Sequence, residues 1–213
     1  ASAYERVLAV DERHLEATGR LVPIYEAEEK WARLPALYET LLEAAEDDAV
    51  KLELIAKLVS VTGGPLANRS GALEWARRGY EIEPSEATLE QLEVAARAAS
   101  SWMPFVEAIE ARLKRKKGLT APLRRALRLK LASVYARELD KVDQAVAVFR
   151  ELVEADPQDE ETVRQLDALL RARGRREDLR WLFELRGAQV EGEARADVLC
   201  EWAQLEEDVF EDP

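Results

Sequence analysis

Apolar residues recur at helical spacing along almost the whole chain. The stretch from Leu131 to Pro157 shows this most clearly, because Leu131, Ala132 and Tyr135 recur three or four positions apart before a polar turn, and Phe149 belongs to a second segment of the same kind. Pro157 stops that second segment. A helical hairpin cannot bury two apolar faces alone, so the pattern predicts neighbouring hairpins.

The same pattern returns at a fixed period. Pro84 and Pro157 close segments with the similar endings YEIEP and VEADP, 73 positions apart, and Glu12 in RVLAVDE lies 72 positions before Pro84. Each period of about 72 residues holds two hairpins. Caps, glycines and prolines predict twelve helices, over residues 3–11, 14–27, 30–46, 48–61, 67–82, 85–98, 102–117, 120–138, 141–155, 158–172, 176–189 and 192–208.

Two prolines lie inside predicted helices. Pro35 is close enough to a helix start to be tolerated. Pro23 lies deeper, so we expect it to kink its helix or to be accommodated by a local distortion.

The spacing of the larger side chains resembles that of the tetratricopeptide (TPR) repeat family. The matching runs are Leu21, Tyr25, Trp31, Leu34, Tyr38 and Leu41; Tyr135, Ala145, Phe149 and Pro157; and Leu166, Leu170, Gly174, Leu179 and Phe183. The family's small glycine on the first helix is missing throughout, and the loop VTGGPLANRSG carries extra residues, so single repeats are degenerate. The resemblance implies an all-α fold, a right-handed α-solenoid of about six antiparallel hairpins.

We expect residues 1–213 to form one solenoid domain, because no linker rich in Ser, Pro or Gly divides the chain. Residues 4–10 read as a second helix without its first, and the last twenty residues read as a first helix without its second. We therefore expect a fragment of a longer array, cut within a repeat at both ends. The abundance of Ala, Leu, Glu and Arg is typical of bacterial arrays from GC-rich genomes.

Candidate catalytic and metal-binding residues are few. His14 reads as a solvated residue beside a helix start, since general acid or base catalysis needs a positioned partner. Cys200 lies at a spacing shared with Leu199 and Trp202, which predicts a small buried side chain. The sequence also lacks metal-ligand and phosphate-loop motifs. We predict no enzymatic activity and no cofactor.

The aromatic residues have a simpler interpretation. Trp31 and Trp102 lie 71 positions apart at equivalent places in successive periods, which indicates repeated packing. Trp75 is left out of this set, and we expect it to be partly exposed. The side chains that we expect mainly in the core are Trp31, Trp102, Trp181, Trp202, Tyr25, Tyr38, Tyr135, Phe149 and Phe183.

Charge is unevenly distributed in this acidic chain. The net charge of −12 disfavours non-specific binding to nucleic acid or to an anionic membrane. No window approaches the apolar length of a bilayer span. A single cysteine allows no internal disulfide and fits a reducing compartment, and we expect a cytoplasmic location. One segment carries nine basic and no acidic residues: Arg112, Lys114, Arg115, Lys116, Lys117, Arg124, Arg125, Arg128 and Lys130.

Part of this basic segment complements a helix C-terminus. The TPR resemblance implies that first-helix residues off the core stripe face a concave groove that usually binds peptides. That spacing selects Arg20, Glu53, Lys57, Gln91, Arg97, Lys130, Ser133, Arg137, Arg164, Ala168 and Arg171. Arginine binds carboxylates through charge-assisted hydrogen bonds, so an acidic peptide or a C-terminal carboxylate is the expected ligand. The predicted partner-binding residues are Arg97, Arg128, Lys130, Arg137, Arg164 and Arg171.

Three functions remain open from the sequence. The first is a non-catalytic scaffold that binds a protein or peptide along its groove. The second is a structural spacer or self-association module of a large multidomain protein, stacking through its end faces. The third, RNA binding by the basic segment, is disfavoured because the equivalent groove positions vary from Gly19 to Arg164, whereas base-reading arrays repeat a small polar set.

Overall fold

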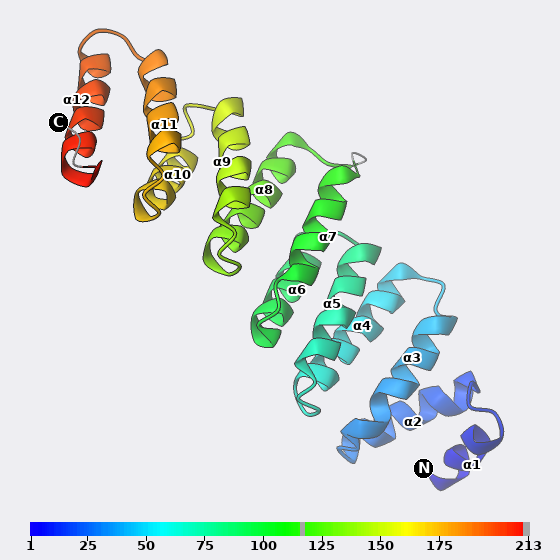
Figure 1. Ribbon diagram of the computed structural model, residues 1–213. Coiled ribbons are helices and arrows are strands. Elements are labelled where there is room, and N and C mark those ends of the chain that lie inside the picture. The colour runs from blue at the N-terminus through cyan, green and yellow to red at the C-terminus, as the bar shows by residue number, and fades with distance from the viewer. Residues whose placement is uncertain (116–117, 211–213) are drawn as a thin grey trace. The chain divides into compact units, whose positions relative to one another are not determined.

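All regular secondary structure in the described part of the chain is helical (Figure 1). The computed structural model describes residues 1–115 and 118–210, and these form twelve α-helices, one short 3₁₀ turn and no strand. The prediction of an all-α fold is confirmed.

The helix bounds agree with the predicted ones to within four residues wherever both ends are described. The helices are α1 Ser2–Val10, α2 Leu15–Ala27, α3 Leu34–Ala44, α4 Asp48–Gly63, α5 Arg69–Ile82, α6 Glu86–Ala99, α7 Met103–Lys114, α8 Ala121–Arg137, α9 Val142–Ala155, α10 Glu160–Ala172, α11 Arg176–Ala188 and α12 Gly192–Phe210. The predicted end of the seventh helix at residue 117 lies outside the described residues, as do Lys116 and Lys117 of the basic segment. The third helix begins late, because Trp31–Arg33 forms the 3₁₀ turn.

The chain divides into two compact units, Ala1–Arg115 with α1 to α7 and Lys116–Pro213 with α8 to α12. Within each unit, consecutive helices pack against one another (Figure 1). The single domain over residues 1–213 stays a prediction.

The first unit is held by apolar side chains that each helix turns towards its neighbours. Leu21, Leu34 and Leu58 are completely buried and come from α2, α3 and α4. Half-buried Trp31 and Trp75 pack against the same cluster. The buried members of this core are Leu21, Val22, Tyr25, Leu34, Leu37, Tyr38, Leu42, Leu54, Ile55, Leu58 and Val61.

Helices α4 and α5 approach closely because two glycines lie between them. A Cβ atom on Gly63 would meet the Cβ of Ala72 at 3.0 Å, and one on Gly79 would meet Cγ2 of Ile55 at 3.3 Å. The loop between these helices ends at Asn68, whose side chain accepts a hydrogen bond from Gly71 N at 3.0 Å and caps α5. The extra residues of this loop therefore form a specific turn rather than a linker.

The second unit has its own core. Leu166, Leu170, Leu179 and Leu182 are completely buried between α10 and α11. The buried members of the cluster are Ala132, Val146, Phe149, Leu152, Val153, Leu166, Leu170, Leu179, Leu182, Phe183 and Leu205. The expectation that the aromatic side chains belong to the core is confirmed, with Trp31, Trp181 and Trp202 only half-buried.

The prediction that Cys200 is buried is wrong, because its side chain is exposed. Helix α12 packs through Val198, Trp202 and Leu205, which recur at intervals of four and three and so share one face. Cys200 lies between these positions and turns away from the core, and Leu199 is 56% exposed.

His14 has the surface position that the sequence predicts and serves as an N-cap. It is exposed, and its Nδ1 accepts a hydrogen bond from Ala17 N at 3.2 Å at the start of α2. Helix α2 is continuous through Pro23, whose side chain is exposed, whereas Pro35 lies in the first turn of α3. The kink at Pro23 stays a prediction.

Tyr38 of α3 contacts side chains of both neighbouring helices, α2 and α4. Its hydroxyl donates to Oε1 of Glu26 on α2 at 2.5 Å, and Nζ of Lys57 on α4 lies 5.8 Å from the centre of its ring. Burial and the hydrogen bond to Glu26 raise the pKa of Tyr38 far above the ordinary tyrosine value of 10.0. Burial also raises the pKa of Tyr25 and of Tyr80.

These shifts predict loss of stability in alkali. A raised folded-state pKa makes a contribution that is complete below about pH 10 and is lost as pH rises towards the folded value. Tyr38→Phe should lower the free energy of unfolding by about 1 kcal/mol at pH 7 and flatten its decline above pH 10. Urea unfolding from pH 7 to 11 measures both effects. Tyr4→Phe, at a half-buried tyrosine without a hydrogen bond to a described residue, should leave the pH dependence unchanged.

Candidate binding clefts

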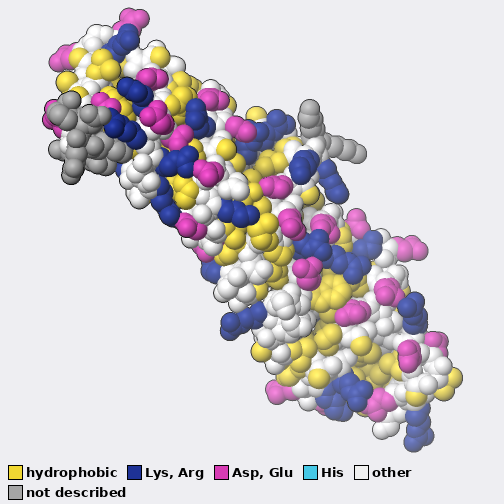
Figure 2. All heavy atoms as spheres, in the orientation of Figure 1, with side chains coloured by type: hydrophobic (Ala, Val, Ile, Leu, Met, Phe, Trp, Pro, Cys, Tyr) yellow, Lys and Arg dark blue, Asp and Glu magenta, His cyan; other side chains and the backbone are white. Residues whose placement is uncertain are grey.

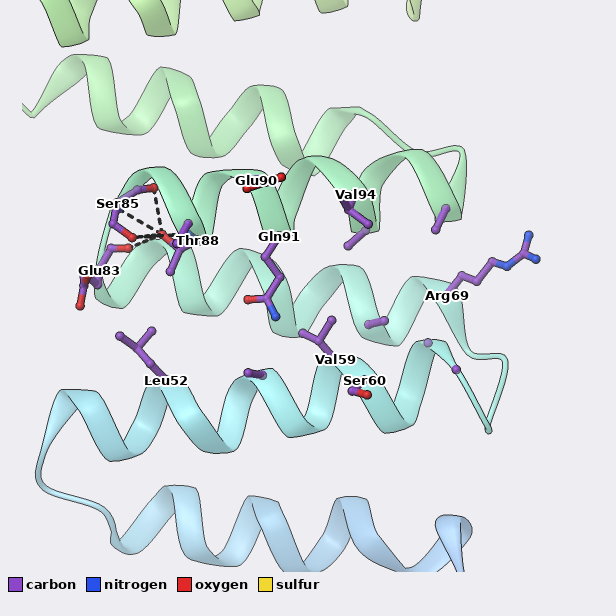
Figure 3. Close-up of a pocket in the computed structure, with 17 residues that line it drawn as sticks. Leu52, Val59, Ser60, Arg69, Glu83, Ser85, Thr88, Glu90, Gln91 and Val94 are labelled. Atoms are coloured by element: carbon purple, nitrogen blue, oxygen red, sulfur yellow. Dashed lines mark hydrogen bonds between the residues drawn. The ribbon is translucent and has the colours of Figure 1, made fainter. Parts of the chain in front are cut away.

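The first unit contains a groove between α4 and α6, with α5 as its floor (Figure 3). The groove encloses about 770 Å³. Figure 3 shows Leu52 and Val59 projecting into it from α4, opposite Gln91 and Val94 on α6. The remaining wall and floor positions are mostly small, so the two walls leave an open trough: Ala56, Gly63, Gly64, Ala72, Ala87, Ala95 and Ala98.

Local capping fixes where the wall formed by α6 begins. The Ser85 hydroxyl accepts a hydrogen bond from Thr88 N at 3.3 Å, and Thr88 Oγ1 accepts one from Ser85 N at 3.1 Å. Thr88 Oγ1 also donates to the carbonyl oxygen of Glu83 at 2.5 Å. This reciprocal box satisfies two backbone donors at the helix start and holds Glu83 at that end of the groove.

The acidic and basic side chains on the groove rim lie apart from each other. Glu83 and Glu90 supply carboxylates from the side of α6, and Arg69 supplies a guanidinium at the start of α5 (Figure 3). None of these three side chains forms an ion pair with a described residue. The rim is therefore acidic along α6 and basic at the opposite end.

The second unit contains a cleft between α8 and α10. It encloses about 390 Å³, and Phe149 and Leu169 contribute its apolar lining. Ser133 and Arg137 line it from α8, while Arg164 lines it from α10. No carboxylate lines it among the described residues. The cleft is small, partly apolar and basic.

The three arginines of this cleft differ in how they are paired. Arg137 is exposed and forms no ion pair with a described residue. Arg164 pairs with Glu161 one turn earlier, and Arg173 pairs with Asp140 at 2.5 Å. Exposed pairs of this kind are weak and exchange readily with solvent or with a ligand. The cleft thus retains an excess positive charge centred on Arg137.

The other predicted binding residues do not line this cleft. Arg128 pairs with Glu151 on α9 at 3.2 Å, and Lys130 is exposed on α8. Arg171 pairs with Asp167 at 2.7 Å and with Glu201 on α12 at 3.1 Å. These pairs tie Arg128 and Arg171 to their own unit.

Arg97 belongs to the first unit, on α6. It is exposed, donates to Glu93 at 3.1 Å, and its guanidinium carbon lies 5.9 Å from the ring centre of Trp102. The structure therefore brings together only Arg137 and Arg164 of the six predicted residues in one cleft, and their role in binding stays a prediction.

Two arginines of the described basic segment pair with acidic residues on other helices of the second unit. Arg125 pairs with Asp159, the residue that caps α10, and Arg128 pairs with Glu151. Figure 2 shows Lys and Arg side chains interspersed with Asp and Glu over the visible face. The predicted cluster of cations is accordingly partly neutralised by acidic side chains on other helices.

The residues of α4 that the TPR resemblance selected differ from those that line the α4–α6 groove. The predicted groove residues Glu53 and Lys57 lie outside it, and Lys57 pairs with Glu53 at 3.5 Å and with Glu26 at 3.9 Å. Ala56 and Ser60 line the groove instead. The available signal was aliphatic residues next to the core stripe, above all Val94, which is 57% exposed. Gln91, Ser133, Arg137, Arg164 and Ala168 of the predicted groove set do line clefts.

The described residues contain no group of three or more His, Cys, Asp or Glu side chains that could hold a metal ion. Within the same part of the chain, no helix combines the length and the apolar character that crossing a bilayer requires. No protein-family model matches this sequence, and no curated protein matches it either. The TPR resemblance stays a prediction.

The contribution of the capping box to the start of α6 can be tested by substitution. Ser85→Ala should lower the free energy of unfolding by about 1 kcal/mol and increase amide hydrogen exchange in the first turn of α6, because it removes an N-cap acceptor. Denaturant unfolding and residue-resolved hydrogen exchange measure these changes. Ser60→Ala is the matched control, since the Ser60 hydroxyl lines the same groove without a hydrogen bond to a described residue. Equal effects from both substitutions would contradict the capping role.

Proposed function

We propose that this chain is a non-catalytic binding module that takes an acidic segment of a partner protein in the α8–α10 cleft. In this proposal the hairpins form a right-handed solenoid of the TPR type, and the cleft is part of its concave, peptide-binding side. The cytoplasmic location stays a prediction.

The observation that carries the proposal is the chemistry of the cleft lining. Arg137 has no acidic partner among the described residues and lies on the same cleft as Arg164, beside the hydroxyl-bearing Ser133. Guanidinium groups hold carboxylates through short charge-assisted hydrogen bonds, often two per group. Leu169, Ala168 and Ala172 add apolar surface for the aliphatic part of a Glu side chain or a neighbouring residue.

A charge-reversal experiment tests this proposal. Arg137→Glu with Arg164→Glu should weaken binding of a fluorescein-labelled acidic peptide of about eight Glu and Ser residues by roughly tenfold or more, because two attractive contacts become repulsive. Fluorescence anisotropy measures the affinity. Binding of the acidic peptide should also fall with added salt, since exposed charges are screened.

The control carries the same change of charge elsewhere on the second unit. Arg180→Glu with Arg195→Glu places two carboxylates at exposed positions of α11 and α12 that do not line the cleft, so affinity should stay within about twofold of the unsubstituted chain. Equal losses from both double variants would mean that only net charge matters and would refute the cleft assignment. Binding of a single-stranded RNA oligonucleotide in place of the peptide would favour the RNA alternative.

The alternative of a spacer or self-association module makes a different prediction. If the chain is such a module, light scattering should show self-association that increases with protein concentration. The double substitution Arg137→Glu with Arg164→Glu should leave that self-association unchanged. A monomer that binds the acidic peptide favours the binding module.

A further inference from the structure

The α4–α6 groove of the first unit differs from the α8–α10 cleft in size, polarity and charge. It is larger, its exposed aliphatic side chains come from both walls, and its rim along α6 carries carboxylates where the other cleft carries guanidinium groups. We infer that this groove docks an amphipathic helix of a partner protein, with the cationic N-terminal end of that helix at Glu83 and Glu90. This site is separate from the acidic-segment site proposed above.

The exposed aliphatic surface indicates that something apolar covers the groove. Val94 is 57% exposed on α6, and Leu52 and Val59 are half-buried on α4 (Figure 3). Ala56, Ala87 and Ala98 are exposed between them, so their small side chains leave room for larger apolar side chains from outside. Contact with an apolar face would remove all of these groups from water.

The backbone of the groove favours a helix over an extended peptide. Both walls are helices, so the N–H and C=O groups along them are already bonded within α4 and α6. An extended peptide would find no free main-chain partners there, whereas a helix satisfies its own backbone groups. The uncharged polar side chains that remain available are few, because Ser85 and Thr88 are used in the capping box and only Ser60 and Gln91 make no hydrogen bond with a described residue.

The length of the groove fits a short helix. The lining positions on α4 run from Leu52 to Gly63, and those on α6 run from Ala87 to Ala98. At the helical rise of about 1.5 Å per residue, each wall is roughly 16 Å long, which matches about three turns of a bound helix.

The charges on the groove rim favour one direction of the bound helix. Glu83 lies where α6 begins, Glu90 follows along the same wall, and Arg69 lies at the far end (Figure 3). A helix carries partial positive charge at its N-terminus and partial negative charge at its C-terminus. Its N-terminal end, with lysine or arginine in the first turn, therefore complements Glu83 and Glu90, and a carboxylate in its last turn complements Arg69.

The experiment uses the full chain and a defined probe. The probe is a fluorescein-labelled helical peptide of about fourteen residues, with leucines on one face, alanines elsewhere, two lysines in the first turn and one glutamate in the last. Val94→Asp should weaken its binding by roughly tenfold or more, because a carboxylate would be buried against leucine. Fluorescence anisotropy measures the affinity, and circular dichroism checks that each variant is folded.

Val50→Asp is the matched control. Val50 is 47% exposed on α4, in the same unit, and does not line the groove, so the affinity should stay within about twofold. Ala98→Glu, at an exposed wall position, is a second variant and should also lower the affinity. No binding of the probe to the unsubstituted chain, or equal affinities of the Val94→Asp and Val50→Asp variants, overturns the inference.

A charge swap tests the direction of the bound helix. Glu83→Lys with Glu90→Lys should weaken binding of the lysine probe. It should strengthen binding of a probe whose first-turn lysines are replaced by glutamates. Unchanged affinities for both probes would overturn the assigned direction. Self-association of the unsubstituted chain that is abolished by Val94→Asp would show that a second copy of this chain covers the groove, and would likewise overturn the inference.

Discussion

A helix of about fourteen residues with an apolar stripe on one side has to be covered by its neighbours, and this burial holds each unit of the chain together. In α4 the stripe consists of Leu54, Ile55, Leu58 and Val61, all buried against α3 and α5. The stripe is narrower than the helix, so the positions beside it belong neither to the core nor to the fully solvated side. The size and charge of the residues at those positions decide whether a cleft forms.

The two clefts differ because different residue types occupy these bordering positions. In the first unit they are small or aliphatic, as at Ala56 and Val94, and the walls of α4 and α6 leave an open apolar trough. In the second unit they include Arg137 and Arg164, and the cleft is smaller and basic. The same helical packing thus produces two surfaces that differ in size and charge.

Arginine has two roles in the second unit, and the distinction matters for where binding can occur. Arg150 of α9 donates to the buried carboxylate of Asp178 at 3.1 Å, and Arg175 donates to the same residue at 2.9 Å. The Arg150 pair joins α9 to α11, the Arg175 pair holds the start of α11, and both guanidinium groups are already engaged with a carboxylate. Arg137 has no such partner among the described residues, which makes it the better candidate for a ligand contact although both kinds of arginine look alike in the sequence.

The sequence predicted the helices well because their signals are local. Asp47, Ser85 and Asp159 cap helices within three residues of their own position, and the core leucines recur at fixed intervals. The side of the helix on which a residue lies is harder to predict, since a shift of one position rotates the side chain by about 100° around the helix axis. An error of this kind placed Cys200 in the core, and a single position separates Lys57 from Ala56, which lines the α4–α6 groove. Pairing across helices, as between Arg128 and Glu151, depends on tertiary packing and leaves no local signal.

Opposite charges at the two clefts would also separate their ligands. An acidic segment that approached the α4–α6 groove would meet Glu83 and Glu90, while a helix with a cationic end that approached the α8–α10 cleft would meet Arg137 and Arg164. Like charges brought together oppose binding, so under both proposals each cleft would reject the ligand proposed for the other. Specificity in this chain would then come as much from repulsion at the wrong cleft as from attraction at the right one. Replacing the two charged residues of one cleft, such as Glu83 and Glu90, would therefore change selectivity as well as affinity.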